Sequence, residues 1–563
     1  VFPDSAAHWA GHATHRAVAR EAAAASLVLL RNAPRDSAAR QARRGNGRAI
    51  DTLAARTLPF GPAVRRLAVI GEDADSVRLG GYSGPGIAPV SILEGIRARA
   101  GQGAQVRYVR GPGRVLAAYT TVPATALEWR DGTTATRGLR GEYWANNALS
   151  GPSAFTRTDE RIDFTWTLSS PGPGLPYDWY SARWTGTLVA PPAGVARLGV
   201  DGNDGVRLWL DDRLVLDAWE KRTAGPQLVD VRLAPGSRHA LRLEYRESTG
   251  NAKLKLVWRE GASGVPAADP IAAAVTAARA SDAAVVVVGL EEGEFRDRSS
   301  LALPGRQEEL IRRVAATGVP TVVVIVGGSA VTMSRWLDDV GAVLMAWYPG
   351  EEGGPAVADV LWGDVNPSGR LPITFPLSEG QLPLTYDHKP TGRGDDYLDL
   401  TGQPLFPFGY GLSYTRFAYD DLRIEVERGV AGSADLSARP ATAAALASPP
   451  GVVRPAAEVP RADIRVRVRA RVRNTGARAG AEVVQLYVRD VLTSTAQPLT
   501  QLKGFTRVAL APGESRDVEF MLDAEALRLL DEGMRWVVEP GTFRVMVGAS
   551  SKDVRLRGEF RIP

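Results

Sequence analysis

The 563 residues are 44% hydrophobic and 23% charged, a composition typical of a globular protein that excludes a disordered or fibrous chain. The net charge of +5 comes from arginines scattered among acids of similar number, so no nucleic-acid partner is expected. Cysteine is absent, which excludes disulfides and thiolate metal sites, and no apolar run is long enough for a membrane-spanning helix. A chain of this length predicts roughly three or four domains.

An α/β pattern opens the chain. Residues 8–32 predict an alanine-rich helix followed by a short apolar strand, and residues 65–74 predict a second strand. The alternation of helix and strand stops near residue 125 and resumes at 271–290. Continuous apolar strands such as "AAVVVV" are typical of a parallel sheet covered by helices on both faces. We therefore predict a discontinuous α/β sandwich domain made of residues 1–130 and 265–412.

Two β-rich regions complete the chain. Residues 138–260 alternate polar and apolar side chains, with turn residues about every eight to twelve positions, which predicts an antiparallel β-sandwich inserted into the α/β domain. Residues 413–563 alternate in the same way, as in "DIRVRVRARVRNTG", and predict a second β-sandwich. Within it, the Ala/Pro-rich stretch 431–460 lacks periodicity and predicts a mobile loop.

Several long motifs identify a resemblance. They are "LAVIGEDADSVRLGGYSGPG", "FRDRSSLALPGRQEELI", "WYPGEEGGPAVADVLWGDVNPSGRLPITFP" and "LFPFGYGLSYT". In this order they resemble the C-terminal two-thirds of glycoside hydrolase family 3, especially its bacterial β-glucosidases. The terminal "VRNTGARAGAEVVQLYVRD" is similar to the fibronectin type III-like domain of that family. The insert, with "DGNDGVRLWLDD", resembles a protective-antigen-type β-sandwich found in some members.

The resemblance implies a catalytic role for the charged segment after the strand at 283–290. Retaining glycoside hydrolysis needs two carboxyl groups roughly 5 Å apart, one as nucleophile and one as acid/base. In the family the acid/base Glu lies three residues before an Asp-Arg pair, which here implies Glu294. Glu292 is the alternative, and Glu291 is a more distant one.

The segment also departs from the family pattern. Phe295 and Arg296 follow Glu294, where relatives usually have Gly and an aromatic residue, so the path of the loop is expected to differ locally. Asp297 and Arg298 are expected to support the loop, with Arg298 paired to Asp297 or to a neighbour. Glu308 and Glu309 are expected in the first turn of a helix, where carboxylates interact favourably with the helix N-terminus.

No metal site or cofactor is expected. His8, His12 and His15 share a predicted helix, but spacing alone is weak evidence for a metal site and the family helix carries none. In the insert, Asn203-Asp204 matches the position of a calcium-binding aspartate pair in related adhesins. The loss of one carboxylate, however, favours an ordinary turn.

The resemblance implies a retaining exo-β-glucosidase that removes terminal β-linked glucose from oligosaccharides or β-glucosides. The alternatives are a β-xylosidase of the same family, or a non-catalytic carbohydrate-binding or adhesion protein that uses the inserted sandwich. The family nucleophile is an Asp on a preceding (β/α)-barrel, and no such domain is predicted here, so we expect the chain to supply only the acid/base half of the site. A truncated or separately encoded barrel would complete it, and the resemblance favours a periplasmic or extracellular location.

Overall fold

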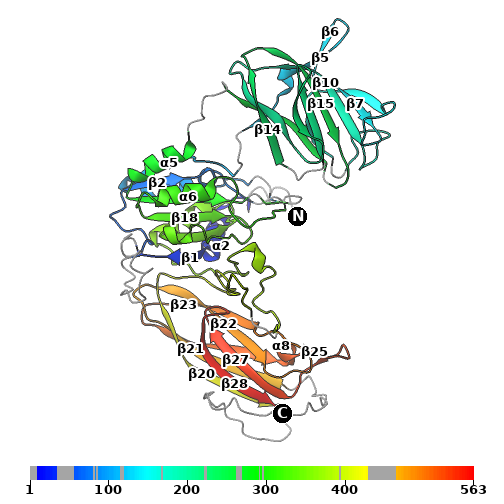
Figure 1. Ribbon diagram of the computed structural model, residues 1–563. Helices are drawn as coiled ribbons and strands as arrows, with labels where there is room; N and C mark the ends of the chain where they lie inside the picture. Colours follow the sequence, from blue (N-terminus) through cyan, green and yellow to red (C-terminus); the bar gives the residue numbers. More distant parts are fainter. Residues whose placement is uncertain are drawn as a thin grey trace. The chain divides into compact units, whose positions relative to one another are not determined.

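The structure is a computed structural model, and its described residues form two compact units (Figure 1). It describes residues 9–34, 56–79, 83, 86–114, 119–166, 169–220, 225–250, 252–261, 269–290, 292–293, 297–391, 395–428 and 464–563. The predicted mobile loop at 431–460 lies outside these residues. One unit combines Val1–Arg114 with Pro270–Pro563, and the other is Val115–Asp269. No helix in the described part of the chain is long and apolar enough to cross a membrane.

The first unit contains a six-stranded sheet in the order β1-β19-β18-β17-β2-β3. Five neighbouring strands are parallel, and β1 pairs with β19 in the antiparallel sense. The strands are β1 (Val28–Asn32), β2 (Arg66–Ile70), β3 (Gln105–Val109), β17 (Ala283–Gly289), β18 (Thr321–Val326) and β19 (Ala342–Trp347). Every residue of β17 and β18 is buried, as expected for strands covered on both faces.

Helices cover both faces of this sheet. Val285 and Val287 face one core with α2 (Ala13–Ser26), α4 (Ile92–Ala100) and α7 (Gly353–Trp362). Val286 and Val288 face the other core with α5 (Pro270–Arg279) and α6 (Gln307–Ala315). Side chains alternate across a strand, so consecutive valines supply both cores. The predicted α/β sandwich is confirmed.

The second unit is built from antiparallel sheets of eight and five strands. Its strands are β4 (Thr120–Thr121), β5 (Leu127–Asp131), β6 (Thr134–Arg137), β7 (Leu139–Trp144), β8 (Phe155–Asp159), β9 (Asp163–Thr165), β10 (Ser181–Val189), β11 (Val195–Gly202), β12 (Gly205–Leu210), β13 (Arg213–Ala218), β14 (Gly225–Leu233), β15 (Arg238–Arg246) and β16 (Lys253–Glu260). The unit begins earlier than the predicted residue 138, because β4 pairs with β16 and β5 pairs with β10. These first strands are too short to show an alternation of polar and apolar residues.

The C-terminal part of the first unit is the second predicted β-sandwich, which is confirmed. One sheet has the order β20-β21-β24 and the other the order β23-β22-β27-β28. The elements are β20 (Phe417–Arg428), β21 (Ile464–Asn474), β22 (Gly480–Asp490), β23 (Gln501–Leu510), β24 (Ser515–Asp523), α8 (Ala524–Leu527), β25 (Leu529–Leu530), β26 (Trp536–Val537), β27 (Gly541–Gly548) and β28 (Val554–Ile562). In β21 the valines are buried while the arginines point outward, which is the predicted period of two.

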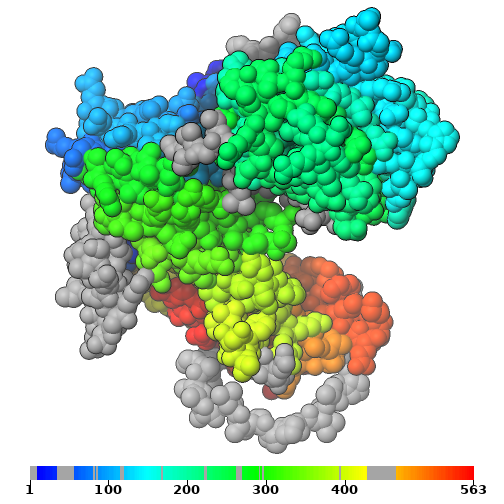
Figure 2. Space-filling model, turned by 45° about the horizontal axis from the view of Figure 1, so that its top comes forward, coloured from blue at the N-terminus to red at the C-terminus, as the bar shows by residue number. Residues whose placement is uncertain are grey.

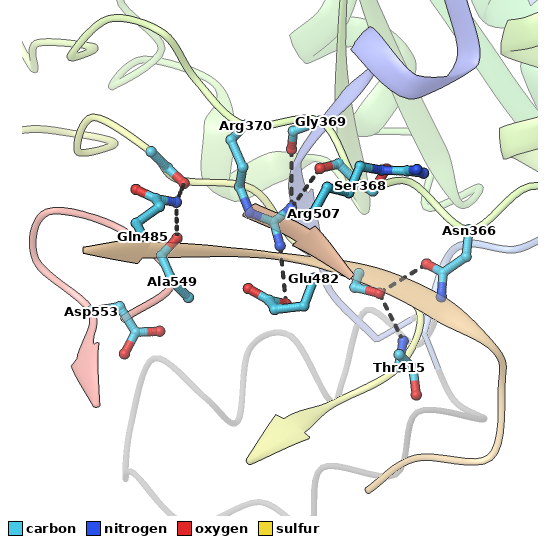
Figure 3. Close-up of polar contacts among 12 residues, drawn as sticks. Asn366, Ser368, Gly369, Arg370, Thr415, Glu482, Gln485, Arg507, Ala549 and Asp553 are labelled. Atoms are coloured by element: carbon cyan, nitrogen blue, oxygen red, sulfur yellow. Dashed lines mark hydrogen bonds and ion pairs between the residues drawn. The ribbon is translucent and has the colours of Figure 1, made fainter. Parts of the chain in front are cut away.

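A connecting segment, residues 364–416, joins the α/β layers to this sandwich. Its described residues contain little regular structure beyond the short helical turn η6 (Glu379–Gln381), and Figure 2 shows its yellow-green atoms next to orange atoms of the C-terminal part. Arg370 donates to the backbone oxygens of Ser368 and Gly369 and to Glu482 of β22, each at 3.1 Å (Figure 3). The side chains of this ion pair are only 8% and 4% exposed, so the pair is buried between the two parts.

A second contact in the same view fixes the end of the connecting segment. Gln485 of β22 donates its amide to the backbone oxygens of Gly409, at 3.1 Å, and Ala549, at 2.8 Å (Figure 3). Gly409 has φ +80°, and a Cβ there would lie 2.1 Å from the Gln485 amide oxygen. A glycine is therefore required for this approach.

Candidate active site

The candidate site lies at the carboxyl edge of the parallel sheet, where β2, β17, β18 and β19 end. Loops that follow parallel strands meet at this edge, and ligands of open α/β sheets bind there. The acid-rich segment predicted to carry catalysis begins at Leu290, directly after β17. The loops after β18 and β19 supply its partners.

Gln307, at the start of α6, fixes the end of β17. Its amide oxygen accepts from the backbone N–H of Gly289 at 2.8 Å, and its amide nitrogen donates to the Gly289 oxygen at 2.9 Å. The same nitrogen donates to the oxygen of Pro304 at 2.9 Å, and the side chain is buried. Gln307 was not among the predicted site residues, and its only sequence signal is its place inside the motif "LPGRQ".

Glu292 is held by three donors from the neighbouring loops. Tyr348, one residue beyond β19, donates its hydroxyl to the carboxylate at 2.8 Å, and Ser329 Oγ and the backbone N–H of Gly328 also donate to it. Burial raises the pKa of Glu292, but these hydrogen bonds outweigh burial, and the pKa lies below its usual range. The side chain is therefore ionised and held by three hydrogen bonds, and its alternative assignment as the acid/base stays a prediction.

Arg298 connects the parts of the loop. Its guanidinium donates to Ser329 Oγ at 2.7 Å and to the backbone oxygens of Ser300 and Ala302 at 3.3 and 3.4 Å. It also lies 3.6 Å from Glu292, which is its carboxylate partner among the described residues. The predicted supporting contacts of Arg298 are thus made with Glu292 and backbone oxygens, while Asp297 is exposed.

Glu294 lies outside the described residues, together with Glu291, Phe295 and Arg296. The described neighbours on either side, Gly293 and Asp297, are exposed. The structure therefore brings together the supports of the loop, and the assignment of Glu294 stays a prediction.

A second carboxyl group, Asp73, is buried beside the end of β17. It follows β2 in the turn η2 (Glu72–Ala74), is 1% exposed, and lies 3.4 Å from both Arg78 and Arg114. Burial raises the pKa of Asp73 to about 6, against the opposing effect of Arg78. A Cβ at Gly289 would lie 2.4 Å from Asp73 Oδ2, so only glycine fits there. Asp73 was also missed, although acids directly after an apolar strand are a signal of this edge.

The remaining sequence predictions can be placed on the structure. Glu308 and Glu309 lie in the first turn of α6, as predicted, and Glu309 accepts from Arg306 at 2.8 Å. His12 and His15 pack with Trp9 near the start of α2, while His8 is outside the described part.

Asn203 and Asp204 of the insert lie in the turn between β11 and β12, as predicted. Both side chains are buried, and Asn203 donates to the Asp204 carboxylate at 2.7 Å. The described residues contain no cluster of three or more His, Asp or Glu side chains arranged to hold a metal ion.

Comparison with protein families shows which family the chain belongs to. The model of the glycosyl hydrolase family 3 C-terminal domain matches residues 46–414. The chain belongs to glycosyl hydrolase family 3. A fibronectin type III-like domain matches residues 482–551, within the C-terminal sandwich. The predicted family and its terminal domain are thereby confirmed, and the protective-antigen-type character of the insert stays a prediction.

Similar proteins of this family include glucosidases and a xylosidase. A periplasmic β-glucosidase of Salmonella typhimurium is 38% identical over 302 residues, covering 51% of this chain and 35% of that protein. A β-xylosidase of Formosa agariphila is 39% identical over 286 residues, covering 50% of this chain and 35% of that protein. The solved structure of a β-glucosidase from Erythrobacter marinus is 28% identical with a TM-score of 0.59, covering 100% of this chain and 52% of that chain. The chain thus spans about a third to a half of the length of these relatives.

Proposed function

We propose that this family 3 chain supplies the acid/base half of a retaining exo-β-glucosidase site, with Glu294 as the acid/base. The observation that supports this is that hydrogen bonds from neighbouring loops already hold the Glu292 carboxylate. Its carboxylate is ionised and engaged with Tyr348, Ser329 and Gly328, so it serves as an anchor. Glu294, which matches the family position three residues before Asp297-Arg298, is then the carboxyl group available for proton transfer.

In the proposed reaction the second carboxylate comes from a (β/α)-barrel domain, as the resemblance implies. It attacks the anomeric carbon while Glu294 protonates the departing glycosidic oxygen, which releases the aglycone and leaves a glycosyl ester. Glu294, now ionised, then takes a proton from water as the water attacks that ester. Glucose is released and both carboxyl groups return to their starting states. The reaction uses no cofactor.

The substrates are proposed to be terminal β-linked glucosides and gluco-oligosaccharides. Xylosides are the second candidate, because the similar protein of Formosa agariphila is a β-xylosidase. A periplasmic or extracellular location is proposed from the similar protein of Salmonella typhimurium, which is a periplasmic enzyme.

Turnover of aryl β-glucosides and aryl β-xylosides tests the proposal. The chain alone is expected to show little or no turnover, and the chain joined to the barrel domain of a β-glucosidase relative is expected to be active. In that fusion E294Q should lower turnover of poorly activated glucosides by about 100-fold or more, and azide should restore turnover of activated ones. Full activity of E294Q, or normal turnover by the unfused chain, would contradict the assignment.

E292Q is the matched control for this experiment. It removes the same charge two residues away, but the amide keeps an acceptor for the donors around it. Azide should therefore give no rescue, because no proton donor is missing. Rescue of E292Q with full activity of E294Q would transfer the acid/base role to Glu292.

A further inference from the structure

The far end of the acid/base loop is held by a carboxylate from a distant part of the sequence. Glu379, in η6 of the connecting segment, accepts from the backbone N–H of Leu301 at 2.6 Å and from Ser300 Oγ at 2.9 Å. The backbone oxygen of Leu301 accepts in turn from the N–H of Thr332 at 3.0 Å. Both backbone polar groups of Leu301 are therefore engaged, and the loop is fixed at this point.

Glu379 is itself set in a rigid turn. Gln381, which is 1% exposed, accepts from the Leu377 N–H at 2.7 Å and donates to the backbone oxygen of Thr401 at 2.8 Å. The hydroxyl of Ser334, in the loop after β18, donates to the Leu377 oxygen at 3.0 Å. These contacts join the turn both to the connecting segment and to the edge of the sheet.

The charge of Glu379 suits this holding role. Hydrogen bonds from its own backbone N–H and from Leu301 hold the pKa of Glu379 below its usual range. Arg335, also from the loop between β18 and β19, acts in the same direction. The side chain is therefore ionised at neutral pH and accepts charge-assisted hydrogen bonds, which are about twice as strong as neutral ones.

We propose that Glu379 is a positioning residue for proton transfer, fixing the C-terminal end of the loop whose N-terminal end is anchored by Glu292. The proposal rests on the proposed function, in which the proton donor Glu294 comes between these two anchors in the sequence. A misplacement of about 1 Å can cost about 100-fold in rate, so a donor on a loop needs supports at both ends. Glu292 joins the loop to the ends of β18 and β19, and Glu379 joins it to the connecting segment.

Hydrogen exchange of the 563-residue chain tests the structural part without requiring turnover. In E379A, exchange in a peptide spanning 297–303 should accelerate by about tenfold or more, as expected for the loss of hydrogen bonds to a charged group. Exchange in β17 and β18 should remain unchanged. The matched control is E514A, because Glu514 accepts a backbone N–H from Ala511 at 2.7 Å in an exposed turn of the C-terminal sandwich. Loop exchange that is the same in E379A as in E514A would overturn the proposal.

Kinetics of the active fusion separate positioning from general stability. E379A should lower kcat by about tenfold or more with KM changed by less than about twofold, because the sugar contacts are left in place. E379Q, which retains an acceptor oxygen, should recover most of the lost kcat. An unchanged kcat, or a loss confined to KM, would overturn the positioning role. If E294Q keeps full activity while E379A accelerates loop exchange, the acid/base assignment fails and the holding of the loop by Glu379 stands.

Discussion

The buried ion pair between Arg370 and Glu482 offers a direct test of how the connecting segment is attached to the C-terminal sandwich. Glu482 accepts from Arg370 at 3.1 Å and from the hydroxyl of Tyr419 at 3.0 Å. E482Q preserves the shape of the side chain but removes its charge. The Arg370 guanidinium would then be buried without an anionic partner, and only neutral acceptors would remain, namely the glutamine oxygen and the backbone oxygens of Ser368 and Gly369.

The expected cost follows from the burial of both partners. Their side chains are 8% and 4% exposed, and breaking a buried pair by removing one partner costs about 3–5 kcal/mol. The matched control is E559Q, because Glu559 pairs with Arg544 at 3.1 Å on the same sandwich while both side chains are about a third exposed. An exposed pair contributes less than about 1 kcal/mol.

Thermal and urea unfolding of the whole chain would measure both variants. E482Q should lower Tm by roughly 5–10 °C, whereas E559Q should lower it by no more than about 3 °C. The double variant R370M/E482L, which removes both charges and keeps apolar volume, should be more stable than E482Q. Equal Tm shifts in E482Q and E559Q would refute the reasoning, because the Arg370–Glu482 pair would then contribute no more to stability than an exposed pair.

Three further changes have defined outcomes. G289A should destabilise the α/β domain by about 2 kcal/mol or more in urea unfolding, because its Cβ would meet the Asp73 carboxylate; a neutral result would show that Asp73 moves freely. Burial, together with the negative charge of Glu539, raises the pKa of Asp490 to about 7. The folded state therefore holds a proton that the unfolded state has lost, and the free energy of unfolding falls as the pH rises from about 4 through 7. D490N should therefore gain about 1–2 kcal/mol at pH 8 and little at pH 4, after allowance for solvent screening, and an equal gain at both would contradict this sign. S91A removes the capping box of α4 and should cost about 1 kcal/mol.

Local patterns in the sequence were sufficient to predict the α/β core. The valine runs of β17 and β18 have one physical explanation, a parallel strand buried on both faces, and both strands occur where predicted. The start of the insert was placed too late because β4 and β5 are short and contain few apolar residues. Their identity depends on pairing with β16 and β10, which lie far along the chain.

The site could be predicted only in part for the same reason. The motif around Asp297 and Arg298 indicated a supported loop, and Arg298 does support it through contacts within the described part of the chain. Gln307, Asp73 and Glu379 were not predicted, since each acts through a contact with a residue that no local pattern connects to it. Glu379 is 78 residues from Leu301 in the sequence, and only the fold brings the two together.

The contacts of Arg370 and Gln485 bear on how pieces of this protein can be exchanged between relatives. A recombinant fragment that ends before Phe417 would leave Arg370 without its carboxylate and Gly409 without the amide that covers it. A terminal domain grafted from another family member would restore them only if it carries an acid and an amide at the positions of Glu482 and Gln485. The fibronectin type III-like domain and the connecting segment, residues 364–416, should therefore be exchanged between relatives as one piece.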